Sequence, residues 1–239
     1  MKVEIWSDVM CPFCYIGKRH FEQALEKLPF KKEIEIDWKS FQLNPEYQNT
    51  SNETVYDYLS RSKGMPVEQA KQMTRQVADM AANAGLTLDF DTSIPANTFN
   101  AHRLIHLAAK HDLQDLAEEK LFEAHFLKGR NIGENDVLID LAVEMGLDKE
   151  EVTAVLNGNE FAEAVRYDIY ESQNLGIRGV PYFVMDRKYG ISGAQPVQAF
   201  TDALTQSFNE WKAAQPKTIL TSLNNNNNDA VCDENGCEI

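Results

Sequence analysis

Two cysteines separated by two residues, Cys11 and Cys14, are the part of this sequence best suited to chemistry. They follow a short apolar run at residues 3–6 and open a helical pattern at residues 16–28. A cysteine at the first turn of a helix faces free backbone N–H groups and the positive end of the helix dipole, which stabilise a thiolate. The thiolate is both the nucleophile and the leaving group of disulfide exchange. The pattern therefore favours redox chemistry over half of a structural zinc site or two incidental thiols.

The two thiols are expected to have different roles. Cys11, at the helix start, is the attacking cysteine, and Cys14, one turn further on, is the more buried, resolving cysteine. Pro12 suits the first helical turn, where its missing N–H matters little. Phe13 cannot supply the positive charge that a histidine could, so we expect Cys11 to be less acidic than in strong dithiol oxidants. This favours a weaker oxidant, a reductase or an isomerase.

Composition narrows the choice of partners. The chain has 239 residues, of which 43% are hydrophobic, enough for one large domain or one domain with an insertion. With 23 basic and 37 acidic residues its formal charge is −14, which disfavours binding to nucleic acid or an anionic membrane surface. The first residues lack the apolar run of a signal peptide, so we expect a cytoplasmic protein whose cysteines are catalytic, redox-sensing or metal-binding.

Hydrophobic periodicity divides the chain into four stretches. Residues 1–45 predict a β-α-β unit, with strands at 3–7 and 34–38 around a helix at 12–28. Residues 46–157 contain no convincing strand and predict an inserted helical domain. Its expected helices run from Pro66 to Gly85 and over 98–111, 113–127, 135–145 and 148–156.

Strand signals return in the third stretch, residues 158–213. It predicts a linking helix at 160–174, two strands at 182–185 and 189–192, and a last amphipathic helix at 197–212. The fourth stretch, residues 214–239, contains five consecutive asparagines and is expected to be a flexible tail.

Three segments, residues 3–14, 97–104 and 176–183, together resemble the DsbA family and are most similar to its cytoplasmic FrnE-like branch. The resemblance implies an α/β thioredoxin fold with an inserted α-helical domain. It also implies a protein disulfide oxidoreductase, reductase or isomerase that acts on protein or small-molecule disulfides and thiols. No cofactor is expected beyond the redox-active disulfide itself, although glutathione would serve as a thiol partner.

The same resemblance assigns further site residues. Pro181 matches the cis-proline that lies beside the cysteines in this fold, where it would leave the backbone of Val180 free to pair with substrate; an ordinary trans proline at a strand start is the alternative. His102 and Arg103 match residues expected to shape the cleft between the domains. The alternative is a purely structural role, in which Asn97 or Thr98 caps the helix and His102 is half-buried with its hydrogen bonds satisfied.

The resemblance also makes Pro12 and Phe13 substrate-binding residues through their place between the cysteines. The remaining histidines, which are His20, His111 and His125, are interpreted as solvated. His102 and His106 have helical spacing but lack the glutamate at 103 that a zinc protease requires, so no metal site is assigned.

The tail ends in a C-x₄-C pair, Cys232 and Cys237, around the turn-forming Asn235-Gly236. About 20 linker residues give a reach of roughly 25 Å, comparable to a domain radius. The pair could therefore meet Cys11 of its own molecule and form a second redox centre. Harmless thiols on a disordered end and a metal-binding tail are the alternatives.

Two other functions fit the sequence. Kappa glutathione transferases and chromene-carboxylate isomerases share the fold, but they commonly place serine where Cys11 stands, whereas this chain keeps both cysteines. The four cysteines could instead form a zinc site without turnover, for which the flexible tail would have to be ordered. The sequence leaves open the direction of electron flow and the oligomeric state.

Overall fold

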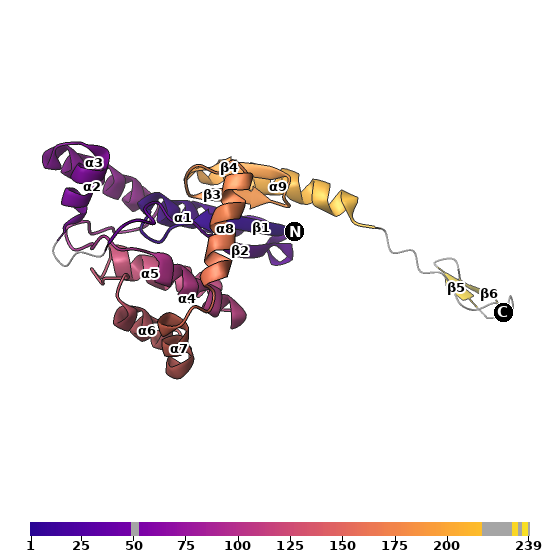
Figure 1. The fold of residues 1–239 in the computed structure, drawn as a ribbon. Helices are drawn as coiled ribbons and strands as arrows, with labels where there is room; N and C mark the ends of the chain where they lie inside the picture. The colour runs from indigo at the N-terminus through magenta and orange to yellow at the C-terminus, as the bar shows by residue number, and fades with distance from the viewer. Residues whose placement is uncertain (49–52, 217–230, 234–235, 239) are drawn as a thin grey trace.

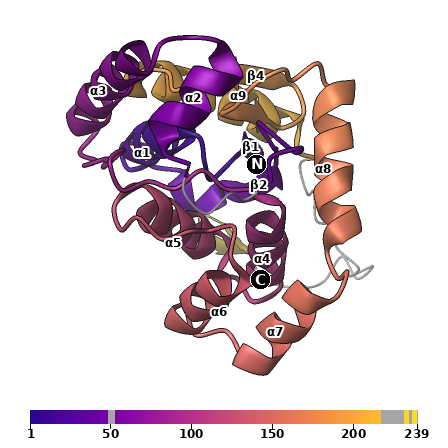
Figure 2. The ribbon, with the colours of Figure 1, turned by 60° about the vertical axis from the view of Figure 1, so that its left-hand side comes forward.

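A four-stranded mixed sheet forms the centre of the molecule (Figures 1 and 2). The computed structural model describes residues 1–48, 53–216, 231–233 and 236–238. The strand order is β2-β1-β3-β4, in which β1 (Lys2–Ser7) is parallel to β2 (Glu35–Ser40) and antiparallel to β3 (Tyr182–Met185). The edge strand β4 (Tyr189–Ser192) forms a hairpin with β3. Ser7, the last residue of β1, therefore leads directly into the cysteine loop.

Side chains alternate between the two faces of the sheet, and helices cover both faces. On one face Phe183 packs on Phe21 of α1 (Pro12–Leu25) and on Phe200 of α9 (Val197–Ala214), at ring distances of 5.3 and 4.6 Å. On the other face Trp6 is buried, and its indole N–H donates to the carbonyl of Asp168 in α8 (Ala162–Asn174) at 2.9 Å. The cysteines at the start of α1 are thus held by a helix that is packed against the core.

The segment between β2 and α8 is helical and contributes six helices to the described part of the chain. Figure 2 shows α2 and α3 beside α1 in the upper half of the view, and α4 to α7 grouped together in the lower half. None of the described helices has the length and apolar character needed to cross a membrane. The six helices are α2 (Val55–Lys63), α3 (Val67–Asn83), α4 (Phe99–Lys110), α5 (Gln114–Phe126), α6 (Asn135–Glu144) and α7 (Lys149–Asn157).

This α/β arrangement confirms the thioredoxin-like fold with a helical insertion that the sequence predicts. Helix α2 is not among the helices expected from the sequence, although a capping box marks its start. The Thr54 hydroxyl accepts a hydrogen bond from the Asp57 N–H, and the Asp57 carboxylate accepts one from the Thr54 N–H. Helix α1 ends at Leu25, earlier than expected, and a 3₁₀ turn at Lys31–Glu33 follows. Short strands β5 (Val231–Asp233) and β6 (Gly236–Glu238) pair antiparallel in the tail, while the asparagine run lies outside the described residues.

Candidate active site

Cys11 occupies the N-cap position of α1, and Pro12 begins the helix. Both Cys11 and Cys14 are free thiols and both are buried, with exposed fractions of 5% and 1%. The backbone N–H of Cys14 donates to the Cys11 carbonyl at 3.0 Å, which fixes the two residues within one helical turn. Burial, followed by the hydrogen bond and the charge of Cys11, raises the pKa of the Cys14 thiol well above its ordinary value. The expectation that Cys14 is the more buried of the two is confirmed.

The loop before β3 lies against the cysteines, as expected. The Val180–Pro181 peptide bond is cis, which confirms the prediction from the sequence. The thiol of Cys11 donates to the carbonyl oxygen of Val180 across 3.7 Å. The Pro181 ring packs on Gly17 of α1 so closely that a Cβ at that glycine would lie 2.9 Å from the ring carbon Cγ. Phe13, which is 38% exposed, and the half-buried Pro12 complete the outer surface of the motif.

Next to the cysteine motif lie two buried polar residues, Ser7 at the end of β1 and Asp8 in the loop that follows. Against the larger rise that burial causes, the Asp8 backbone and the Ser7 side chain both act to lower the pKa of the Cys14 thiol. The Asp8 carboxylate accepts from the N–H groups of Met10 at 3.3 Å and Leu43 at 2.7 Å. Asp8 therefore holds the cysteine loop in place.

Helix α5 brings a second carboxyl to this region. Glu118 is 1% exposed, and its Oε2 lies 3.5 Å from the Ser7 hydroxyl. Burial raises the pKa of Glu118 to about 8, although the nearby Lys18 ammonium opposes this rise. Lys18 is itself buried on α1 and forms ion pairs with Glu119 at 3.1 Å and Asp115 at 3.4 Å.

The structure brings His102 near the loop but places Arg103 elsewhere. His102 is buried, with Nε2 at 3.7 Å from the Asp8 carboxylate, too long for an ordinary hydrogen bond. Arg103 donates to the backbone carbonyls of Glu160 at 2.9 Å and Gly158 at 2.8 Å, and so closes the end of α7. The expectation that Arg103 shapes the cleft is therefore corrected, because these carbonyls occupy its guanidinium.

A cavity of about 630 Å³ opens beside Cys11, between the cysteine loop and the inserted helices. His125 lines it and is 1% exposed, so the interpretation of this histidine as solvated is wrong. Burial lowers the pKa of His125 to about 4, which leaves the imidazole neutral, and its Nδ1 has no hydrogen-bond partner. Most of the lining is apolar and includes Met10, Leu59, Val77, Phe90, Phe126 and Val180.

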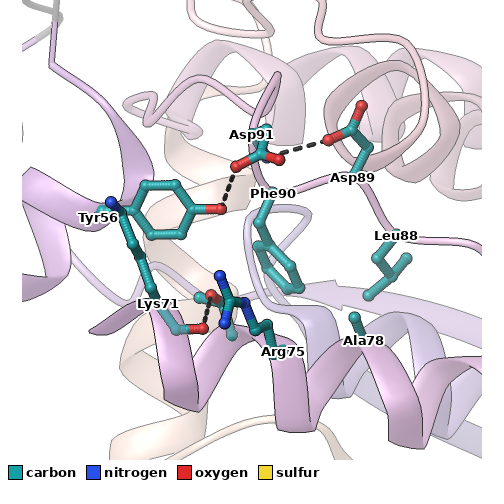
Figure 3. A pocket seen from close by; sticks show the side chains of 9 residues that line it. Tyr56, Lys71, Arg75, Ala78, Leu88, Asp89, Phe90 and Asp91 are labelled. Carbon is teal, nitrogen blue, oxygen red and sulfur yellow. Dashed lines mark hydrogen bonds between the residues drawn. The ribbon is translucent and has the colours of Figure 1, made fainter. Parts of the chain in front are cut away.

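A smaller pocket of about 260 Å³ adjoins this cavity, and Phe90 and Thr74 line both. Figure 3 shows it between α3 and the segment that carries Asp89 and Asp91. The Tyr56 hydroxyl donates to Asp91 at 2.6 Å across its mouth. Its lining combines basic and acidic side chains and contains no thiol, so we place the chemistry in the larger cavity.

The described residues contain no group of three or more His, Cys, Asp or Glu side chains placed to hold a metal ion. Sequence reasoning missed Ser7, Lys18, Glu118 and His125 as site residues. Ser7 could have been identified as a site residue from its position at the end of β1, four residues before Cys11. The other three carry no local sequence signal, since their importance comes from contacts between α1, α5 and the loop.

Comparisons with known proteins agree with this geometry. A family model described as a DSBA-like thioredoxin domain matches residues 2–205. A crystal structure of a probable DsbA oxidoreductase from Streptomyces coelicolor is 37% identical, with a TM-score of 0.83, covering 100% of this chain and 99% of the other. The uncharacterised protein YwbO of Bacillus subtilis is 27% identical over 205 residues, which are 85% of this chain and 95% of that protein. The cytosolic disulfide reductase DsbM of Pseudomonas aeruginosa, solved with GSH, shares the fold at 16% identity and a TM-score of 0.61, covering 87% of this chain and 100% of the other.

Proposed function

Since the chain belongs to the family of DSBA-like thioredoxin domains, we propose that it exchanges disulfides with protein or small-molecule partners through Cys11 and Cys14. The observation that carries the proposal is the placement of both thiols at the start of α1, with the Val180 carbonyl 3.7 Å from the sulfur of Cys11. The helix N-terminus stabilises negative charge on the attacking sulfur. The adjacent Val180 backbone offers an extended partner chain a place to pair.

In the proposed cycle the Cys11 thiolate attacks a substrate disulfide, whose S–S bond breaks and releases one substrate sulfur as a thiolate. Cys14 then attacks the sulfur of Cys11, releases the second substrate sulfur and forms the Cys11–Cys14 disulfide. The substrate gains two electrons and the two cysteines lose two. The reverse sequence oxidises a dithiol substrate, and the reduction potential relative to the compartment determines which direction prevails.

The test compares two single substitutions. Cys11→Ser should lower the rate of insulin reduction to that of dithiothreitol alone, because the attacking thiol is lost and the remaining Cys14 is buried. Cys14→Ser should instead accumulate mixed disulfides between Cys11 and substrate, because the resolving thiol is absent. Mass spectrometry after acid quenching measures both. Equal trapping at residues 11 and 14 would contradict these roles.

The tail pair, Cys232 and Cys237, is proposed as a second redox centre. The backbone register of β5 and β6 places the two residues opposite each other. Directly opposed residues of an antiparallel pair have Cα atoms about 4.5–5.5 Å apart, within the range of about 4.4–6.8 Å that a disulfide takes. In a Cys14→Ser background, mild oxidation should link Cys11 to one tail cysteine at a rate independent of protein concentration. Identical turnover after deletion of residues 216–239 would remove the tail from the mechanism.

A glutathione-dependent transferase or isomerase is the competing function, and the cavity beside Cys11 is the observation that supports it. Among the described residues that line this cavity, Lys63 is the only one that carries a positive charge at neutral pH, whereas glutathione carries two carboxylates. The cavity therefore favours disulfide exchange with a more apolar partner. Conjugation of glutathione to an aromatic electrophile, unaffected by Cys14→Ser, would support the transferase instead.

As part of the same proposal, we assign the protein to the cytoplasmic FrnE-like branch, which the C-x₄-C tail supports. Trapping the thiols in intact cells with an alkylating agent tests the assignment. A cytoplasmic reductase should be recovered with Cys11 and Cys14 mostly reduced during growth. Recovery of the protein in an exported fraction would contradict it.

A further inference from the structure

The cavity beside Cys11 contains one buried polar side chain that the proposed cycle does not use. His125 on α5 is 1% exposed and lines the cavity, and its ring Nδ1 has no hydrogen-bond partner among the described residues. The Ser93 hydroxyl donates to the backbone carbonyl of His125 at 3.1 Å, which holds this turn of the helix in place. A buried nitrogen without a partner costs stability, so it marks a place where a bound molecule can form the missing hydrogen bond.

Other polar side chains of the cavity already have partners or are exposed. The Asn44 amide donates to the Tyr58 hydroxyl at 3.3 Å, and the Thr74 hydroxyl donates to a backbone carbonyl of its own helix at 3.0 Å. Lys63 is exposed at the end of α2. Among the described lining residues, His125 is thus the one whose buried side chain still has an unpaired nitrogen.

The charged side chains of α3 face the smaller pocket rather than this cavity. Lys71 and Arg75 line the smaller pocket (Figure 3), whereas the same helix contributes Met73 and Val77 to the larger cavity. A charged arm of a partner would lose water in the larger cavity without gaining a buried ion pair with the described lining residues. The larger cavity therefore favours an uncharged partner.

Aromatic rings form one part of the cavity wall. The rings of Phe90 and Phe126 meet edge to face with their centres 5.9 Å apart, and the His125 ring meets Phe126 in the same way at 4.4 Å. Phe13 and Tyr58 also line the cavity. A bound aromatic ring gains offset or edge-to-face contacts with such a wall. The volume of about 630 Å³ lies within the range of about 300–1,000 Å³ that is typical of small-molecule sites.

We propose that the cavity binds one arm of an uncharged aromatic disulfide that carries a hydroxyl group, and that His125 forms a hydrogen bond with this hydroxyl. Burial lowers the pKa of His125 to about 4, so the ring is neutral at physiological pH. A neutral imidazole has one donor and one acceptor nitrogen, and a hydroxyl can pair with either. The inference rests on the dithiol exchange proposed above and names a substrate class for it.

The chemical step remains that of the proposed cycle. The Cys11 thiolate attacks the aromatic disulfide, one aryl thiolate leaves, and the other aryl group stays bonded to the Cys11 sulfur with its ring in the cavity. Cys14 then attacks the Cys11 sulfur and expels the second aryl thiolate. The disulfide gains two electrons and the two cysteines lose two. His125 determines which arm is bound and takes no part in the transfer of electrons.

Single-turnover reduction by full-length protein with Cys232→Ser and Cys237→Ser tests the proposal. The probes are diphenyl disulfide, its ortho, meta and para dihydroxy derivatives, and oxidised glutathione as a charged reference. Saturation of the rate of thiolate release separates the dissociation constant from the limiting rate. The preferred hydroxy isomer should bind about tenfold more tightly than diphenyl disulfide, as one hydrogen bond allows, and oxidised glutathione should bind more weakly than either. His125→Phe should abolish the preference, mainly through the dissociation constant.

The matched control is His111→Phe, which should keep the preference, because His111 pairs with Glu151 at the surface beyond the end of α4. If His125→Phe does not fold, nitrogen-15 labelling of the histidines in Cys14→Ser decides the matter. The mixed disulfide with the preferred isomer should then shift the ring nitrogen signals of His125 relative to the phenyl mixed disulfide.

Four results would overturn the inference. They are equal binding of the four aromatic probes, tighter binding of oxidised glutathione, a preference that survives in His125→Phe, and unshifted His125 signals. Failure of the parent protein to react with any of the five disulfides would overturn the proposed function instead.

Discussion

Gly17 allows a sharp test of how tightly α1 is seated against the proline loop. A Cβ at this position would lie 2.9 Å from Pro181 Cγ and 3.4 Å from Phe183 Cζ. Carbon atoms in ordinary contact are about 3.5–4.0 Å apart, so Gly17→Ala forces an overlap of about 0.6 Å at the ring. Helix propensity alone would make alanine more stable by about 1 kcal/mol. Overpacking of a core costs about 1–3 kcal/mol, so we expect a net loss of about 1 kcal/mol.

That loss corresponds to a fall in melting temperature of about 2–4 °C for a chain of this size. The displaced ring belongs to the loop whose Val180 carbonyl contacts Cys11 at 3.7 Å, and small misplacements of reacting groups are costly. Turnover of insulin disulfides should therefore fall by about tenfold. Thermal unfolding by circular dichroism and the turbidity assay for insulin reduction measure the two effects. Gly17→Ser should be worse in both, whereas a raised melting temperature with normal turnover for Gly17→Ala would refute the packing argument.

Two further substitutions test buried charges. Lys18→Met should destabilise the fold by about 1–2 kcal/mol at pH 7, because Glu119 loses the buried Lys18 ammonium but keeps Arg19 and Tyr15 as partners. Burial alone would raise the pKa of Glu119, but Lys18, Tyr15 and Arg19 together lower it below 4.5. The stabilisation from Lys18 is therefore present above pH 4.5 and is lost as the pH falls through the folded pKa. Urea unfolding should show a smaller difference in stability between the variant and the parent protein at pH 4 than at pH 7. Asp168→Asn should cost about 2 kcal/mol at pH 7, because Asp168 accepts from the Ser40 N–H at 3.0 Å and pairs with His106 at 3.0 Å. Although burial alone would raise it, these partners lower the pKa of Asp168 below 3.8, so the cost should shrink as the pH falls through that value; a cost that stays constant in acid would contradict the assignment.

The parts of this fold that the sequence predicted are those with local signals. Strand β2 alternates between apolar and charged residues, and α9 carries one apolar face, so periodicity located both. The CxxC and Val-Pro motifs are each contiguous, and the topology of the fold then brings them together. The helix α2 was missed because its signal, the capping box at Thr54, is confined to its first turn.

The parts that the sequence could not predict depend on contacts between distant segments. Ser7 and Glu118 are 111 positions apart, and no pattern near either residue indicates that they meet. Helix α5 buries polar as well as apolar residues, including Glu118 and His125, so its periodicity gives no warning that these side chains face the cysteines. The prediction that Arg103 lines the cleft was wrong for the opposite reason. Arg103 lies within a recognisable motif, but its guanidinium binds backbone carbonyls at the end of α7.

The two halves of the site come from different parts of the chain, and this division has a chemical consequence. The sheet and α1 supply the sulfurs and fix their separation, whereas α5 supplies Glu118 and the neutral His125. Removing water from the resolving thiol keeps its proton on, since a buried thiolate without a partner is unstable. The site therefore keeps Cys14 as a protonated thiol until a partner reaches Cys11, and the inserted helix sets how much water the pair meets. The same CxxC motif beside a different insertion would keep both thiols but would present Cys11 to a cavity with a different lining, and so to different partners.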